Sequence, residues 1–413
     1  MKTITFSLPV LVVCVCSTAM RAQGRMAPDS VARQTQSDDY TRYELLEPGS
    51  AKFRIIYEVT ATTTGARYFF NPIRKGSVAS DERVSARTSG QPLVFETVSG
   101  SAARAGGVRN ADTTGLYIRV SLPRPVPGDG GESRILIDKT YYDPSSYRVD
   151  STGVVVFSRS LGIKRNAVVL PAGYEVISSN WPSQILQEAD GRIAITFWNN
   201  TPAEAPVEIR ARRLTSVVAA SALPKAIQAR LDDRAHQNRE IVYFLRQPET
   251  HTFDLYHDYT ESRPGIGTYL NVVRAGSSVA GPSARLLDTG EELKWEVMKG
   301  EAITKAGLDV PDVTPQTEVV VFRFAPVKAG ESVRLRMNET YTDSARYRLD
   351  NGTLIWDRSF GRPTNAVVLP AGWRLTNSSI PASVSMLPDG RVRLDFINPR
   401  PDEIAVLITA ARR

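Results

Sequence analysis

The chain contains one long segment twice, and this duplication constrains the fold more than any other feature. Residues 140–173 read TYYDPSSYRVDSTGVVVFSRSLGIKRNAVVLPAG, and residues 340–372 read TYTDSARYRLDNGTLIWDRSFGRPTNAVVLPAG. About half of the aligned positions are identical, and a spacing of about 200 residues relates the flanking sequences as well. A repeat this long indicates two homologous domains rather than a solenoid of short units.

Apolar and polar residues alternate along both copies, which is the pattern of strands with one buried face. Phe53 and Ile55 alternate with charged neighbours, and Phe253 and Leu255 repeat the pattern in the second copy. Asp-Gly pairs such as residues 190–191 separate the runs and are typical of hairpins. We expect about ten or eleven strands per copy, in an all-β fold of two tandem sandwich-like domains. Whether each copy is one sandwich or two small packed sheets stays open.

Three stretches do not alternate. Residues 101–114 and 301–317 differ most between the copies and are expected to be surface loops. Residues 224–240 read PKAIQARLDDRAHQNRE, with proline at a possible first helical position and apolar residues at intervals of four. This stretch predicts a short helix in the linker between the domains.

The N-terminus has the features of a secretory signal peptide. Lys2 precedes an apolar stretch over residues 4–15, and small residues follow up to Ala19. We expect cleavage near Ala19, with Ala22 as the alternative, and therefore a secreted or periplasmic protein. A transmembrane anchor would need roughly 18 apolar residues, which this stretch lacks.

Both cysteines of the chain, Cys14 and Cys16, lie in this leader, so the mature protein is expected to have no disulfide. A lipoprotein signal would place a small residue before its cysteine, whereas Val13 and Val15 stand there. Lipid anchoring is therefore the less favoured alternative.

The expected organisation follows from the duplication and the leader. It consists of a signal peptide (1–19), a flexible segment (20–40), a first β domain (41–213), a linker with a short helix (214–240) and a second β domain (241–413).

The net charge of +7 comes from 51 basic against 44 acidic residues, and the basic residues are mostly arginines scattered along alternating segments. Residues 210–213 and 412–413 are the densest places. Proteins that bind nucleic acid concentrate basic residues on one face or tail. This distribution indicates solvated strand faces and no nucleic-acid partner.

Motifs for catalysis or metal binding are missing from the sequence. Its histidines are His236, His251 and His257, and the last two would lie about 20 Å apart along one strand. No HExxH, CxxC or EF-hand pattern occurs, and the serines of 276–281 lack the GxSxG spacing. We therefore predict no catalytic residue, no cofactor and no metal site.

Polar residues shared by the copies are the best candidates for a site. They are Asp143, Arg159 and Asn166, with partners Asp343, Arg358 and Asn365. One interpretation is a ligand-binding corner present once per domain. The other is structural, with Arg159 paired to a carboxylate and Asn166 bonded to backbone groups. The structural interpretation is favoured, because duplicated folds retain their internal scaffolding.

The openings of the two copies, YELLEPGSAKFRIIYEVT and YFLRQPETHTFDLYHDYT, resemble the N-terminal β domain of gluzincin aminopeptidases. This resemblance implies a non-catalytic β module, because the zinc-binding helix of those enzymes has no counterpart in the sequence. The whole chain also resembles secreted bacterial proteins with repeated NAVVLPAG-type units, which implies no activity.

Two functional hypotheses follow. The first is a secreted or periplasmic, non-catalytic protein whose tandem β domains bind a protein, a glycan or another envelope component. The alternative is a carbohydrate-active or hydrolytic enzyme with its site at the domain junction, where clefts tend to form. A shell of carboxylates, tyrosines and arginines in a junction cleft would favour the enzyme. The sequence leaves the oligomeric state open.

Overall fold

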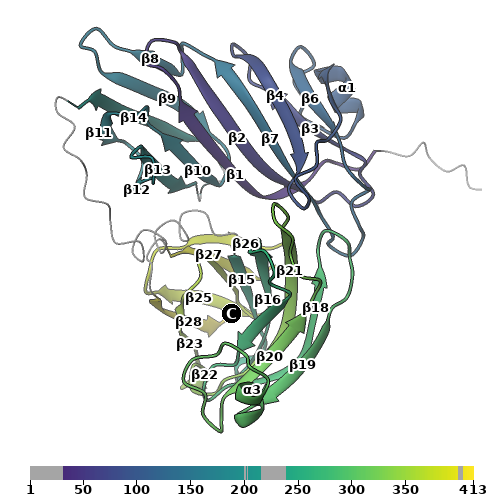
Figure 1. The fold of residues 1–413 in the computed structure, drawn as a ribbon. Coiled ribbons are helices and arrows are strands. Elements are labelled where there is room, and N and C mark those ends of the chain that lie inside the picture. Colours follow the sequence, from purple (N-terminus) through teal and green to yellow (C-terminus); the bar gives the residue numbers. More distant parts are fainter. Residues whose placement is uncertain (1–30, 200, 202, 215–238, 399–402) are drawn as a thin grey trace, which may run out of the picture.

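The structure is a computed structural model that describes residues 31–199, 201, 203–214, 239–398 and 403–413 (Figure 1). Strands dominate it, and its helical elements are short: α1 (Gly100–Ala105), α3 (Glu301–Lys305) and the 3-10 turn η1 (Pro248–Thr250). The all-β class predicted from the sequence is confirmed. The expected signal peptide and residues 224–238 of the expected linker helix lie outside the described residues.

The first domain contains three sheets. The largest has seven strands in the order β12 (Gln184–Gln187), β13 (Ile193–Trp198), β10 (Arg165–Val169), β1 (Gln36–Leu45), β2 (Lys52–Ala61), β7 (Ser133–Tyr142) and β4 (Val78–Ala86). A four-stranded sheet has the order β11 (Tyr174–Ser179), β14 (Ala205–Arg213), β9 (Val155–Leu161) and β8 (Tyr147–Val149). The third has β3 (Tyr68–Ile73), β6 (Leu116–Ser121) and β5 (Phe95–Ser99). Neighbouring strands are antiparallel except β1 and β10, which are parallel.

The second domain repeats this topology strand for strand. Its seven-stranded sheet has the order β26 (Ser383–Met386), β27 (Val392–Ile397), β24 (Thr364–Val368), β15 (Arg239–Leu245), β16 (Thr252–Glu261), β21 (Val333–Thr342) and β18 (Ser278–Leu286). The smaller sheets are β25 (Trp373–Ser378), β28 (Ile404–Arg412), β23 (Thr353–Phe360) and β22 (Tyr347–Asp350), and β17 (Thr268–Val272), β20 (Glu318–Arg323) and β19 (Lys294–Lys299). Thus β1 corresponds to β15 and β14 to β28.

One apolar core lies between the three sheets of each domain. In the first domain, Phe53 of β2, Phe69 of β3 and Phe157 of β9 are all buried in the same cluster. Phe253 and Trp356 lie in the equivalent cluster of the second domain, with ring centroids 4.9 Å apart. Each copy is therefore a sandwich of a large sheet against two smaller ones, a third arrangement beside the two that the sequence left open.

Several boundaries differ from those expected. Each copy has more strands than ten or eleven, because β1, β4, β8 and β12 have no clean apolar alternation. Strand β1 begins at Gln36, so residues 36–40 of the segment expected to be flexible belong to a sheet. Residues 101–114 begin with most of α1 rather than being entirely loop. Ala103 of this helix is fully buried, which explains why the turn is ordered into a helix.

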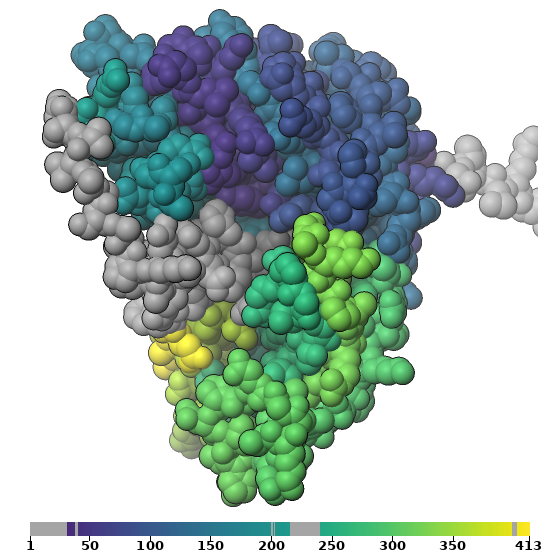
Figure 2. Space-filling model, in the orientation of Figure 1, coloured from purple at the N-terminus to yellow at the C-terminus, as the bar shows by residue number. Residues whose placement is uncertain are grey.

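The two domains contact each other directly, and Figure 2 shows the first (purple to teal) stacked on the second (green to yellow). Arg134 of β7 donates to both carboxylate oxygens of Asp288, at 2.9 and 2.7 Å, and to the Ser332 carbonyl at 3.1 Å. The Glu132 amide donates to the Leu287 carbonyl at 2.9 Å. Buried polar contacts therefore join the ends of equivalent strands from the two domains.

Candidate functional site

A cavity of about 810 Å³ lies between the sheets of the first domain. Its floor comes from the inward face of the seven-stranded sheet, where alternate residues of β1, β2 and β7 point to the same side. Strand β3 forms one wall, and the end of β9 with the turn after it forms another. The volume falls in the range of roughly 300–1,000 Å³ that is usual for small-molecule sites.

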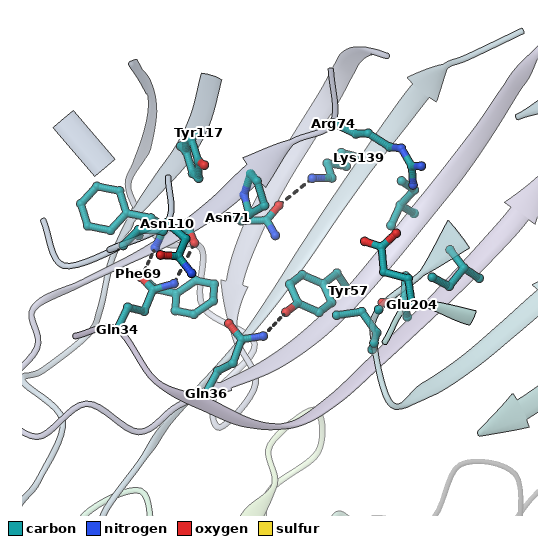
Figure 3. Close-up of a pocket in the computed structure, with 18 of the residues that line it drawn as sticks. Gln34, Gln36, Tyr57, Phe69, Asn71, Arg74, Asn110, Tyr117, Lys139 and Glu204 are labelled. Atoms are coloured by element: carbon teal, nitrogen blue, oxygen red, sulfur yellow. Dashed lines mark hydrogen bonds between the residues drawn. The ribbon is translucent and has the colours of Figure 1, made fainter. Parts of the chain in front are cut away.

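Lys139 is the most unusual side chain in this cavity (Figure 3). It follows Ile135 and Ile137 on the inward face of β7, at a position where an apolar residue is expected, and only 4% of it is exposed. Its ammonium donates to Asn71 Oδ1 at 2.6 Å and lies 4.9 Å from the centre of the Tyr141 ring. An ammonium group has three donors, so this single hydrogen bond leaves capacity for a further acceptor.

Burial lowers the pKa of Lys139 to about 7, and repulsion from the Arg159 guanidinium acts in the same direction. Glu82 acts in the opposite direction. Among the residues that the structure describes, no carboxylate forms an ion pair with this ammonium, and its hydrogen bond goes to a neutral amide. An anion entering the cavity would supply the missing charge.

Cationic side chains dominate the lining. They are Arg33, Arg74, Arg109, Lys139 and Arg159, against the single carboxylate of Glu204. Arg159 is paired with a carboxylate behind the wall, so its charge is largely neutralised. The rest of the lining mixes neutral polar side chains, such as Gln34 and Asn110, with apolar and aromatic ones that include Ile55 and Phe69. The cavity thus combines a positive centre with an apolar body.

The segment before β1 covers part of the opening. Gln34 donates to the Phe70 carbonyl at 3.0 Å and accepts from the Phe70 amide at 2.9 Å. Gln36 donates to the Tyr57 hydroxyl at 3.0 Å, also at the cavity (Figure 3). Gly107 lies under this segment, and an added Cβ would stand 2.5 Å from the Ala32 carbonyl oxygen. Glycine is therefore required for this close approach.

The equivalent cavity of the second domain is smaller, about 150 Å³, and differs in charge. Glu339 takes the place of Lys139 and accepts from Asn271 Nδ2 at 2.6 Å. Burial raises the pKa of Glu339 to about 7. His257, at the position of Tyr57, is buried there and lies 3.2 Å from the Tyr269 hydroxyl through its Nδ1. The duplicated site has kept its asparagine and changed the ionisable residue bonded to it.

The structure brings two of the three predicted residues together in each copy. Arg159 Nη1 donates to Asp143 Oδ2 at 2.8 Å, and Arg358 Nη1 donates to Asp343 Oδ2 at 3.1 Å. Burial alone would raise the pKa of Asp143, but hydrogen bonds from Ser145, Ser146 and Ser77 lower it to about 2. These contacts agree with the structural interpretation. Arg159 and Arg358 also line the cavities, so a role in ligand binding stays a prediction.

Asn166 and Asn365 each bond the backbone just before their strand. Asn166 Nδ2 donates to the Ile163 carbonyl at 2.8 Å, and Asn365 Nδ2 donates to the Arg362 carbonyl at 2.8 Å. The side-chain oxygens of both asparagines are buried without a hydrogen-bond partner within the described part of the chain. Asn365 lines the smaller cavity, and its ligand-binding role also stays a prediction.

The domain junction holds the carboxylates that the enzyme hypothesis would need. Asp288 is bound by Arg134, and Glu132 lies 3.6 Å from both Arg134 and Arg334. All four residues are buried, with at most 8% of each exposed. Burial raises the pKa of Glu132 to about 8, and the nearby Arg134 acts in the opposite direction. The junction residues serve a packed contact, whereas the two cavities described above lie within the domains.

Within the residues that the structure describes, no group of three or more His, Cys, Asp or Glu side chains could hold a metal ion. In the same part of the chain, no helix has the length and apolarity needed to cross a membrane.

No protein-family model matches the chain, and neither does any curated protein. Among solved structures, an M1 zinc metallopeptidase from Deinococcus radiodurans is similar to 48% of this chain over 52% of its own length, with a TM-score of 0.30 and 11% identity. An aminopeptidase N family protein from Idiomarina loihiensis is similar to 41% of this chain over 29% of its own, with a TM-score of 0.25 and 10% identity. The chain thus spans about half the length of the metallopeptidase.

Lys139 was not among the residues predicted from the sequence, although a signal for it exists. Within the run from Ile135 to Tyr141, alternate positions are apolar except Lys139, and Glu339 breaks the alternation at the same place in the second copy. An ionisable residue on an inward face in both copies indicates a site rather than a solvated strand face.

Proposed function

We propose that the protein is a secreted or periplasmic, non-catalytic binding protein, and that its ligand is a small molecule or chain end that enters the first-domain cavity. The observation that carries this proposal is a cavity of about 810 Å³ with a buried ammonium, Lys139, that has one hydrogen-bond partner within the described chain. A concave, partly apolar site with one polar anchor is typical of ligand binding. A concave site of this kind favours a small-molecule ligand over a flat protein surface.

The proposal is tested by a fragment screen on the mature chain, with neutral, cationic and anionic compounds and ligand-observed NMR. Ile163→Trp provides the cavity-filling variant. Ile163 lines the cavity, and its counterpart in the second domain is the larger Arg362, so the fold accepts a bulky side chain there. We expect hits that bind the native chain and are lost in Ile163→Trp.

Val94→Trp is the matched control, because Val94 is 76% exposed and does not line the cavity. Hits should persist in this variant. An absence of hits, or hits that both tryptophan variants retain, would contradict a ligand site in the cavity.

Export is part of the proposal and has its own test. Expression with the native leader, followed by N-terminal sequencing of the exported protein, should give a chain that begins just after Ala19 or Ala22. Retention of the full-length chain in the cytoplasm would contradict it.

A further inference from the structure

We infer that the first-domain cavity selects organic acids, holding a single carboxylate against Lys139 and the apolar body of the ligand against the aromatic lining. This inference rests on the proposed function and specifies the chemical class of its ligand. The hydrogen-bond partner of Lys139 in the structure is an amide oxygen, so a ligand carboxylate would not have to displace a carboxylate of the protein.

The charge distribution favours an anion. If Arg159 is set aside because Asp143 neutralises it, four cationic side chains still line the cavity against one carboxylate, Glu204. Lys139 is the deeply buried one of the four, with 4% exposure. A cation would meet repulsion at this point, and a neutral ligand would leave the ammonium without a counter-charge.

One charge is favoured over two at the buried end of the ligand. The buried ammonium can neutralise one carboxylate, whereas a second carboxylate beside it would be a desolvated charge next to the apolar wall. Asn71 holds the ammonium from one side through its Oδ1, which fixes the direction of the remaining donors. A carboxylate accepts such charge-assisted hydrogen bonds at short distances.

The remainder of the cavity fits an apolar body. Phe69 lies on the β3 side, and Leu161 and Ile163 lie after β9 in the same apolar cluster, whereas Phe70 and Tyr117 line the part of the cavity where they pack with Ala103 of α1. Aromatic and aliphatic groups on facing walls can enclose a phenyl ring or a short alkyl chain.

The second domain provides a contrast within the same molecule. Glu339 stands at the position of Lys139, and the cavity there has about 150 Å³. Asn271 still bonds the ionisable residue, but it donates to Glu339 where Asn71 accepts from Lys139, and His257 stands at the position of Tyr57. Selection of acids should therefore belong to the first domain alone.

Binding should weaken at high pH, because a neutral amine loses the charge that attracts a carboxylate. The charged and titratable groups that face Lys139 are Arg159 of β9, Glu82 of β4, Arg74 after β3, Glu204 before β14, and the tyrosines 43, 57 and 141. With the pKa of Lys139 at about 7 in the free protein, affinity for an acid should fall between pH 6 and pH 9 by about the 10- to 100-fold that the charge contributes.

The experiment compares acids, amides and amines that share one apolar body, by calorimetry on the mature chain. The probes are 3-phenylpropanoate and octanoate, with the corresponding amides and amines. At pH 6 we expect each acid to bind about 10- to 100-fold more tightly than its amide, as for one charge-assisted hydrogen bond in a buried site. The amines should bind more weakly than the amides.

Lys139→Met should bring the affinity for each acid down to that of its amide and remove the pH dependence. Lys52→Met is the matched control, because Lys52 is an exposed lysine on the adjacent strand β2. This variant should change neither the affinity for the acids nor the pH dependence of that affinity. Far-UV circular dichroism and a thermal melt confirm that both variants are folded.

Three outcomes would overturn the inference. They are equal binding of acids and amides, acid binding that Lys139→Met leaves intact, and no binding by any acid. In the first two cases, the proposed function would still hold if the ligands bind the native chain and fail to bind Ile163→Trp. Loss of every ligand class in the fragment screen would remove the function as well.

Discussion

Lys139 places a charge where water solvates it poorly. Burial lowers its pKa to about 7 from 10.5, so the folded state binds the proton less tightly than the unfolded chain. Below pH 7 the lysine is protonated in both states, and the folded state bears the full cost. Between pH 7 and 10.5 the unfolded chain binds more protons, so stability from this group rises with pH.

Lys139→Met should therefore stabilise the ligand-free protein at pH 6, by on the order of a few kcal/mol. The gain should shrink as the pH approaches 10. Urea unfolding of the native chain and the variant at pH 6 and pH 10 measures it. A destabilised variant at pH 6, or a gain that does not change with pH, would contradict the description of Lys139 as an uncompensated buried cation.

The contribution of Glu339 to the free energy of unfolding depends on pH in the opposite direction. Its pKa is raised by burial to about 7 from 4.5, so the cost to the folded state is absent below pH 4.5 and complete above pH 7. Glu339→Gln should leave stability unchanged at pH 4 and increase it at pH 8, by on the order of a few kcal/mol. Urea unfolding checks this, with the exposed Glu291→Gln as a control that changes neither value.

At the scale of elements, the Arg159–Asp143 pair holds the turn after β7 against β9. Asp143 accepts hydrogen bonds from three serines as well as from Arg159. Asp143→Ala would leave the Arg159 guanidinium buried and unpaired, and such a loss costs about 3–5 kcal/mol.

Chemical unfolding of Asp143→Ala measures that cost. The control is Glu175→Ala, which removes an exposed ion pair with Arg212, where the side chains are 42% and 65% exposed. This control should cost less than about 1 kcal/mol. Similar losses of stability in the two variants would mean that the buried Arg159–Asp143 pair does not stabilise the fold more than an exposed pair does.

The elements predicted from the sequence are those with one buried and one solvated face. Strands such as β2 and β7 alternate cleanly, and agreement between the copies fixed their register. Strand β4 lies at the edge of its sheet, and its sequence VASDERVSA is polar because most of it faces solvent. Strand β8 has three residues, too few for a period to show. Strand β4 is specified by β7, a partner distant in the sequence, whereas β8 is specified by a short hairpin with β9, and a local apolar pattern shows neither.

The candidate site was predicted only in part for the same reason. Asp143 and Arg159 were recognisable because both copies keep them, and the structure pairs them. The cavity itself depends on how three sheets meet, which the sequence pattern does not specify. Lys139 and Glu339 differ between the copies, so a search for shared residues passes over them.

At the scale of the whole molecule, the domain junction should couple the unfolding of the two domains. Asp288 of the second domain is bound by Arg134 of the first, and both are buried. Asp288→Ala would leave Arg134 unpaired in the junction, which weakens the contact between domains. Calorimetry should then show two separated transitions in place of the native profile.

Asp389→Ala is the control for the junction, because Asp389 is 50% exposed and pairs with Arg391 of its own domain. It should leave the native profile unchanged. An Asp288→Ala profile that matches this control would show that the domains unfold independently of the junction.

The central claim is that Lys139 anchors a ligand in the first-domain cavity. The most direct test is a crystal structure of the mature chain with the acid that binds most tightly in the calorimetric series. The carboxylate should lie within hydrogen-bond distance of Lys139 Nζ, with the apolar body between β3 and the turn after β9. The cavity of the second domain should contain no acid. An acid found elsewhere, or one seated in the cavity with its carboxylate pointing away from Lys139 to solvent, would contradict the claim.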